Sequence, residues 1–322
     1  MNATLTGPQA PRRARPRLLR GLTWLVLRQH RAALGGAVAV TVLGSLWIVY
    51  ERARLTELLA ASGWPERTVP LPVVGEGYSS LTALLTLLPG VFAVFFGAPL
   101  IATDQEQGTA RFVTTQSVTR GRWAVAKLGW CLTITLVACS VLSAAFTWLW
   151  RPHRSVLPDL WMDPSAFDTT GPVLPALALF LTAAGVTIGV LLRRVLAAMV
   201  VTFGFTVVAQ TAWSMFRDRL GTPHTLTYPL DAAQPARLDG AYELDRWVGS
   251  ADGRLYGWGS CAEATEKATD ACVREKGIVN NVVEYLGPEQ MGAMQWTGAG
   301  VLLAGTVALS AFALWWTSRR PR

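Results

Sequence analysis

Few side chains in this sequence have the type and spacing that catalysis or metal binding needs. No HExxH pair, no GxSxG nucleophile elbow and no GxxxxGKS/T phosphate loop occurs in it. The three histidines lie far apart, at His30, His153 and His224. Asp159, Asp163 and Asp168 follow His153, and we interpret that segment as a solvated acidic loop, not as a metal site. The sequence therefore predicts no catalytic residue, no metal site and no cofactor on this chain, and hence no enzyme.

The composition excludes most classes of soluble protein. Of 322 residues, 51% are hydrophobic and only 16% are charged, whereas a soluble domain carries about 25% charged residues. A disordered chain, a disulfide-rich miniprotein and an ordinary cytosolic enzyme are excluded, and a polytopic membrane protein remains. The net charge of +8 is also typical of nucleic-acid-binding proteins, but the positions of the basic residues favour a membrane explanation.

Six apolar runs are long enough to cross the hydrocarbon core of a bilayer as helices. They are Ala32–Tyr50, Ser79–Ala102, Trp123–Trp150, Gly171–Leu192, Val195–Phe216 and Thr297–Thr317. The deepest polar side chains in them, such as Gln210 and Thr211, are uncharged. Ion-coupled carriers need ionisable groups at membrane depth. The membrane part therefore has no energy source of its own, and a partner must supply the energy for any work that it does.

The arrangement of Arg and Lys predicts the orientation of these spans. Residues 1–31 hold seven Arg and no acidic residue, and the turn between the fourth and fifth spans is Arg193-Arg194. Because cytoplasmic loops carry the excess of Lys and Arg, both termini are expected in the cytoplasm. The fold class is then an all-α membrane protein with six transmembrane helices. An extracytoplasmic, mainly helical domain is expected at 217–296, between the fifth and sixth helices.

The stretch before the first span is expected to form an amphipathic helix on the cytoplasmic membrane surface. Arg17, Arg20, Arg28 and Arg31 fall on one side of a helical wheel, opposite a leucine-rich face, with Trp24 at headgroup level. Two interpretations remain open: a positive-inside anchor, or an elbow that transmits motion to the first span. A cleaved secretory signal is disfavoured, because the apolar run starts late and no cleavage site follows it.

The connection at 103–122 is the most informative cytoplasmic stretch. Thr103-Asp-Gln-Glu106 has capping-box spacing and predicts a helix that starts at the membrane exit. Asp104 and Glu106 are the only acidic residues on a strongly basic face, so an exposed acidic spot here suits a basic patch on a soluble partner. Simple helix capping is the alternative. Gly108 permits a bend or a close approach of the partner's backbone.

At these residues the sequence resembles the cytoplasmic coupling segment of type-2 ABC exporter permeases, above all the actinobacterial ones. The resemblance rests on the E-x-G-T step from Glu106 to Thr109, the following Thr-Gln-Ser-Val-Thr-Arg120, and Trp123 with Lys127. The run Trp24 to Arg31 is similar too, as is the region from Cys261 through Tyr285 to Trp296. The coupling site that it implies consists of Asp104, Glu106, Gly108, Thr109, Arg111 and Arg120.

The resemblance further implies a homodimer or heterodimer of permeases in a bacterial plasma membrane, bound to separate ATPase subunits that carry ATP and Mg²⁺. The chain itself would then perform no chemistry and bind no nucleic acid. It would move a hydrophobic or amphipathic substrate outward, such as a drug, a lipid or a peptide. The alternative is a membrane sensor or resistance scaffold that binds an extracellular ligand without transporting it.

Two short helices are expected in the domain at 217–296: one that starts at the capping box Ser260–Glu263 and stops at Gly277, and one at Ile278–Leu286. Cys261 and Cys272 would lie too far apart for a bridge within one straight helix. Either the segment is a hairpin closed by a disulfide, or both thiols are free. The resemblance favours the bridge.

Two features predict how the spans pack and bend. Gly185 and Gly189 form a GxxxG step in the fourth span, for which close packing within one subunit and a dimer interface are the two interpretations. Pro89 and Pro99 should kink the second span.

Overall fold

The computed structural model describes residues 28, 31–66, 76–108 and 119–319. Six of its helical segments are long and apolar enough to cross a membrane, which confirms the six expected spans. Most are longer than expected. The segments are Arg31–Ser62, Glu76–Glu106, Arg120–His153, Val173–Leu192, Val195–Leu220 and Pro288–Arg319.

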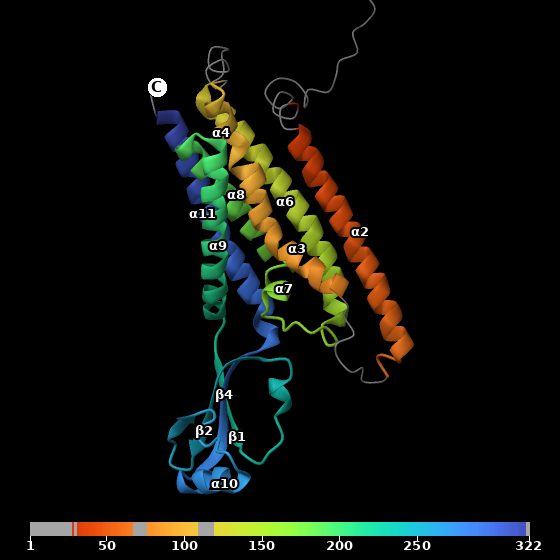
Figure 1. Ribbon diagram of the computed structural model, residues 1–322, viewed down its shortest axis with the longest axis vertical. Coiled ribbons are helices and arrows are strands. Elements are labelled where there is room, and N and C mark those ends of the chain that lie inside the picture. The colour runs from red at the N-terminus through yellow and green to blue at the C-terminus, as the bar shows by residue number, and fades with distance from the viewer. Residues whose placement is uncertain (1–27, 29–30, 67–75, 109–118, 320–322) are drawn as a thin grey trace, which may run out of the picture.

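The six segments form a bundle around one central helix, α8 (Val173–Leu192), which is almost entirely buried. Around α8 pack α3 (Glu76–Phe92), α6 (Arg120–His153), α9 (Val195–Phe216) and α11 (Met291–Arg319) (Figure 1). The first helix, α2 (Arg31–Ser62), lies outermost and packs on α6. Large apolar side chains of the outer helices face outward. Exposure of these side chains to water would be unfavourable, whereas their contact with lipid is not.

The second span is not one continuous helix. A π-helical turn, η2 (Ala93–Gly97), separates α3 from the short helix α4 (Pro99–Glu106), and Ala98 N–H donates to the carbonyl oxygen of Ala93 at 2.9 Å. The break lies between the two prolines for which kinks were expected, Pro89 inside α3 and Pro99 at the start of α4. π-helical turns of this kind are frequent at functional sites.

The GxxxG step of α8 packs against this turn within the same chain. A Cβ atom on Gly185 would lie 2.5 Å from the carbonyl oxygen of Ala93, and one on Gly189 would lie 2.3 Å from that of Ala98. Only glycine permits so close an approach of the two backbones. These contacts place the glycines at the junction of α8 with the broken span.

The domain between α9 and α11 is built on a β-sheet, so the expectation of a mainly helical domain is wrong. Its four antiparallel strands have the order β1-β4-β2-β3. They are β1 (His224–Pro229), β2 (Tyr242–Ser250), β3 (Leu255–Gly257) and β4 (Ile278–Leu286). The segment 278–286, expected as a helix, is a central strand because its β-branched residues pack on both faces of the sheet.

One helix, α10 (Glu266–Glu275), accompanies the sheet. The predicted capping box at Ser260–Glu263 is wrong: Thr265 is the N-cap and accepts a hydrogen bond from the N–H of Ala268 at 3.3 Å. Gly277, the predicted stop, follows the helix in the left-handed conformation with φ +62°. The helix therefore ends where the sequence indicates but begins later.

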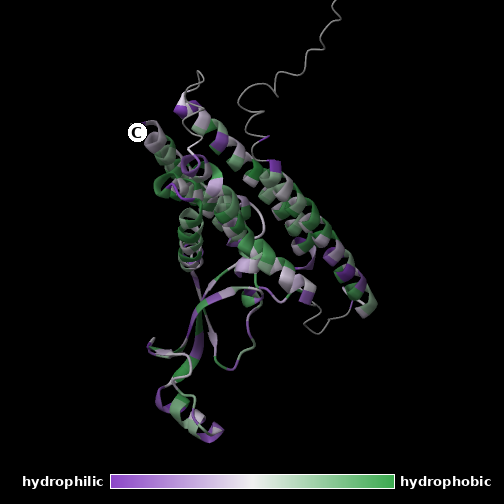
Figure 2. Ribbon diagram, turned by 45° about the horizontal axis from the view of Figure 1, so that its top comes forward, coloured by the Kyte–Doolittle hydropathy of each residue, from purple (hydrophilic) through white to green (hydrophobic). Residues whose placement is uncertain are grey.

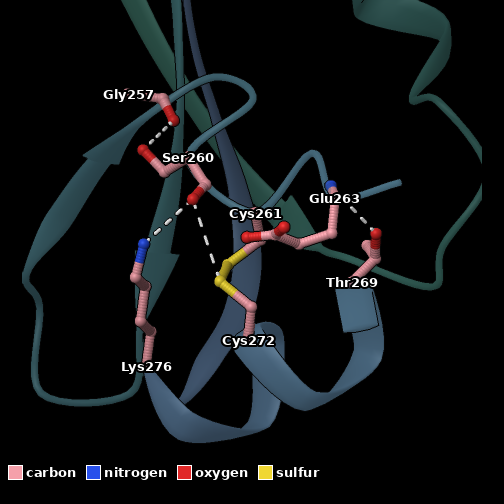
Figure 3. Close-up of a disulfide and its surroundings, with 7 residues drawn as sticks. All are labelled: Gly257, Ser260, Cys261, Glu263, Thr269, Cys272 and Lys276. Atoms are coloured by element: carbon pink, nitrogen blue, oxygen red, sulfur yellow. Dashed lines mark hydrogen bonds between the residues drawn. A yellow bond between two sulfur atoms is a disulfide. The ribbon is translucent and has the colours of Figure 1, made fainter. Parts of the chain in front are cut away.

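Cys261 and Cys272 are joined by a disulfide that ties the segment after β3 to α10, with their Cα atoms 5.6 Å apart. Figure 3 shows the bridge beside the Lys276 amine, which donates to the carbonyl oxygen of Ser260 at 3.0 Å. Of the two alternatives that the sequence left open, the structure has the bridged one. Cys131 and Cys139 are free and buried in α6.

The sheet domain joins the bundle through two chain crossings, one from α9 into β1 and one from β4 into α11 (Figure 1). Gln290 bridges them, since it accepts from the N–H of Thr222 at 2.9 Å and donates to its carbonyl oxygen at 3.1 Å. We call this end of the bundle the sheet end. The opposite end, with Arg31, Arg120, Arg193, Arg194 and Arg319, is the basic end. Figure 2 shows hydrophobic residues concentrated in the long helices between the two ends.

Candidate functional site

The candidate coupling residues lie at the basic end, where α4 ends, α6 begins and α8 turns into α9. α4 packs on both α8 and α9 and also touches α6. The turn between α8 and α9 is sharp: Arg193 adopts the left-handed conformation with φ 58°, and Arg194 is the N-cap of α9. Three spans therefore meet around the eight residues of α4.

Asp104 lies inside this junction and not on its surface. It is 4% exposed and forms an ion pair with Lys127 of α6, which is itself fully buried. The Lys127 ammonium group also donates to the carbonyl oxygen of Leu100 at 3.3 Å and lies 5.1 Å from the ring centre of Trp123. The expectation that Asp104 belongs to an exposed acidic spot is therefore wrong. The ion pair that it forms with Lys127 holds α4 against α6.

The capping box predicted at Thr103 is also wrong. Thr103 lies inside α4, where its hydroxyl donates to the carbonyl oxygen of Pro99 at 2.8 Å, and the helix ends at Glu106 instead of starting here. The physical reason is that Pro99 starts a helical turn after the π-helical break, and the apolar residues that follow it continue the span.

Glu106 is exposed, but one of its carboxylate oxygens already accepts a hydrogen bond within the chain. Its Oε2 accepts a hydrogen bond from the backbone N–H of Val195, the first residue of α9, at 2.8 Å. The first N–H groups of a helix have no partner within it, and a carboxylate is a favourable acceptor at that position. Glu106 therefore caps α9 from the end of the second span and holds α4 against α9.

The remaining predicted residues lie around this junction or outside the described residues. Gly108 is exposed and left-handed, with φ +71°, just after α4. Arg120 starts α6, behind the N-cap Thr119. Thr109 and Arg111 lie outside the described residues, as do Arg17, Arg20 and Trp24 of the expected interfacial helix. Arg28 and Arg31 are exposed, and Arg31 is the first residue of α2.

Sequence reasoning missed Lys127 as the partner of Asp104. The signal was present: a lysine just inside an apolar span needs a counter-charge at the same depth. Asp104 lies near the end of the preceding span and is one of only two acidic residues on that side. Pairing consecutive spans by depth would have joined the two residues.

A second buried polar cluster lies at the sheet end, around Asp168. The Trp213 indole donates to Asp168 Oδ1 at 2.7 Å, and Arg217 donates to Oδ2 at 3.2 Å. Gln295 of α11 donates to the carbonyl oxygens of Phe167 and Thr170 at 2.9 and 3.1 Å. Burial raises the pKa of the Asp168 carboxyl, and the Trp213 hydrogen bond and the Arg217 charge oppose that shift.

The interpretation of segment 151–170 as a solvated acidic loop is thus wrong for its last aspartate. Asp168 is buried because its part of the segment, with the short helix α7 (Pro164–Phe167), packs against the ends of α9 and α11. His153, the last residue of α6, is also buried, and its ring lies beside that of Trp64. Among the described residues no group of His, Cys, Asp and Glu is arranged to hold a metal ion.

Comparison with known protein families identifies the class. Residues 37–217 match the family described as ABC-2 membrane transporter related, which is more than half of the chain. The chain belongs to this family, and it is therefore a multi-pass membrane component of a transport system. The matched region covers most of the first span, all of the second to fourth, α4 included, and most of the fifth, whereas the sheet domain and α11 lie beyond it. No curated protein and no solved structure matches the chain.

Proposed function

We propose that this chain is the permease subunit of an ATP-driven exporter and that a separate ATPase subunit binds its basic end. Family membership is the observation that carries the proposal, since ABC-2 permeases normally work with an ATPase subunit. In this proposal the chain moves a hydrophobic or amphipathic substrate outward across a bacterial plasma membrane. The family supports this function over that of a sensor or scaffold.

The charges and the disulfide support one orientation of the chain. Clustered arginines at the basic end favour the cytoplasmic side. A disulfide persists in an oxidising compartment, so the bridge between Cys261 and Cys272 favours an extracytoplasmic sheet domain. Both arguments agree, because the two features lie at opposite ends of the bundle. Both termini would then be cytoplasmic.

The junction at α4 suggests how motion of the ATPase would reach the spans. Lys127 ties α4 to α6 through Asp104, and Glu106 ties it to the first turn of α9. Force applied at Glu106, Gly108 or Arg120 would therefore move α4 together with α6 and α9. In this proposal Asp104 is a positioning residue inside the permease, and the outer contacts come from Glu106, Gly108, Thr109, Arg111 and Arg120.

Co-purification with the ATPase subunit tests the proposal. Arg120→Glu and Glu106→Arg should abolish capture of the ATPase and ATP-dependent efflux. Glu106→Gln keeps an acceptor for Val195 N–H and separates the loss of charge from the loss of the helix cap. Arg219→Glu is the matched control, because Arg219 is exposed at the sheet end. Unchanged capture in both charge-reversal variants would contradict the coupling site.

The proposed assembly contains two permease chains, identical or different. Its support is the exposed apolar surface of α9 and α11, where Leu196, Val208 and Val307 are 76%, 68% and 68% exposed. Lipid covers part of this surface, and a second chain is the proposed cover of the rest. Cross-linking of single-cysteine variants at exposed positions of α9 in native membranes, followed by mass determination, tests for the dimer.

A further inference from the structure

A pocket of about 230 Å³ lies in the sheet-end half of the bundle, apart from the junction at α4. It is lined by residues of α3, α7, α8 and α9 and by Asp168, which follows α7. Its wall combines apolar side chains of α8 with polar side chains of α9 and α3. The apolar residues are Leu174 and Leu177 on α8, and the polar residues are Gln210, Thr211 and Ser214 on α9 and Thr86 on α3. Thr211 is exposed, whereas Gln210 and Ser214 are half-buried, so the pocket opens on the outside of the bundle beside α9.

The polar groups of the wall keep an acceptor and a donor that the described residues leave unused. One N–H of the Gln210 amide donates to the carbonyl oxygen of Thr86 at 3.1 Å, and its second N–H makes no hydrogen bond with the described residues. The Ser214 hydroxyl donates to the carbonyl oxygen of Thr211 at 2.8 Å. The amide oxygen of Gln210 receives no hydrogen bond from the described residues. A group that enters the pocket therefore meets an acceptor and a donor on Gln210, and a hydroxyl, which both donates and accepts, satisfies the two.

The pocket offers no unpaired charge. Asp168 belongs to its wall, but both carboxylate oxygens are engaged, one by the Trp213 indole and one by the Arg217 guanidinium. A charged ligand would thus lose its hydration without gaining a counter-charge. Leu174, Leu177 and Pro89 supply the apolar remainder of the wall, against which a hydrocarbon chain can lie.

We propose that this pocket binds the polar end of an uncharged amphipathic molecule that carries a hydroxyl donor, with its apolar part against α8. If the chain is the exporter proposed above, on which this step rests, the molecule bound here belongs to the class of substrates that it transports. An uncharged polar end with a hydroxyl and an apolar tail is shared by a free long-chain alcohol and by an uncharged lipid with free glycerol hydroxyls, such as a monoacylglycerol. The site itself is defined by this chain alone and needs no ATPase.

Protection of a cysteine placed in the pocket tests the proposal. In Thr211→Cys the new thiol is the reactive one, because Cys131 and Cys139 are buried and the other pair is bridged. The full chain is placed in phosphatidylcholine nanodiscs, and its modification by a small methanethiosulfonate is timed. The probes are decanol and decyl methyl ether, which share the apolar chain and differ in the donor. Ala212→Cys, exposed next to the pocket on α9 but not part of its wall, is the matched control.

Decanol at roughly ten times its Kd should slow modification of Thr211→Cys about tenfold, while the ether, which accepts but does not donate, should slow it much less. In the double variant Gln210→Leu/Thr211→Cys, decanol should no longer slow the modification. The same slowing in phosphatidylcholine nanodiscs that contain a monoacylglycerol, without decanol, would support the site with lipid as the ligand source. Equal effects of alcohol and ether, or equal slowing at Ala212→Cys, would overturn the proposal. Protection without ATP-dependent efflux would leave the site in place and contradict only the exporter function.

Discussion

The Lys127 ammonium group lies fully buried against the carboxylate of Asp104, and this ion pair joins the end of the second span to the start of the third. A buried charge without its partner is far more costly than the pair itself. The ion pair therefore holds α4 against α6, together with apolar contacts such as those of Leu100 and Ile101 with the start of α6, and α4 in turn holds the first turn of α9 through Glu106.

Lys127→Met should destabilise the protein strongly. The substitution leaves the Asp104 carboxylate buried without this counter-charge, so we expect the free energy of unfolding to fall by about 3–5 kcal/mol. Titration of the purified protein with SDS, followed by circular dichroism, measures the loss. The double variant Asp104→Leu/Lys127→Met should recover most of it, because no charge remains buried. A single variant that unfolds like the wild type would show that the pair does not hold the junction.

Glu106→Ala should loosen the first turn of α9. Loss of an N-terminal cap costs about 1 kcal/mol, and the amide of Val195 should then exchange its hydrogen about fivefold faster. Hydrogen exchange followed by mass spectrometry measures the effect on the peptide around residue 195. Glu106→Gln retains an acceptor and should exchange like the wild type. Equal rates in the Ala and Gln variants would contradict the capping role.

Removing the disulfide should destabilise the sheet domain and leave the bundle intact. Cys261 and Cys272 are separated by 11 residues in sequence, and closing a loop of about that size stabilises a fold by roughly 3 kcal/mol. Limited proteolysis of Cys261→Ser/Cys272→Ser should cleave within 255–277 before any cut appears in the helices. Denatured wild-type protein should show two reactive thiols before reduction and four after it. Four thiols before reduction would refute the bridge.

Gly189→Leu should disrupt the contact between α8 and the broken second span. Even a Cβ atom at this position would lie 2.3 Å from the carbonyl oxygen of Ala98, so backbone must move. Overpacking of this kind typically costs about 1–3 kcal/mol, which a lower Tm in detergent would report. Gly204→Leu on α9 is the control, because a Cβ atom there meets nothing within 4 Å. Similar melting of the two variants would contradict a special role for Gly189.

Much of the fold could be predicted from the sequence, because a bilayer reduces the problem to local composition. Twenty consecutive apolar residues cross the hydrocarbon as a helix whatever their neighbours are, so the six spans followed from residue types alone. The sheet domain has no such constraint. The run Ile278–Leu286 is compatible with a helix or a strand, and only its pairing with β1 and β2 decides between them.

The candidate site divides in the same way. The sequence by itself determined that the chain carries no catalytic or phosphate-binding motif and that Asp104 and Glu106 lie among arginines at one membrane exit. Only the tertiary structure decided that Asp104 is buried against Lys127, that Glu106 caps α9, and that Gln210 faces a pocket. The physical reason is that burial and hydrogen bonding depend on side chains from other spans, whereas helix formation in a membrane depends mainly on the segment itself.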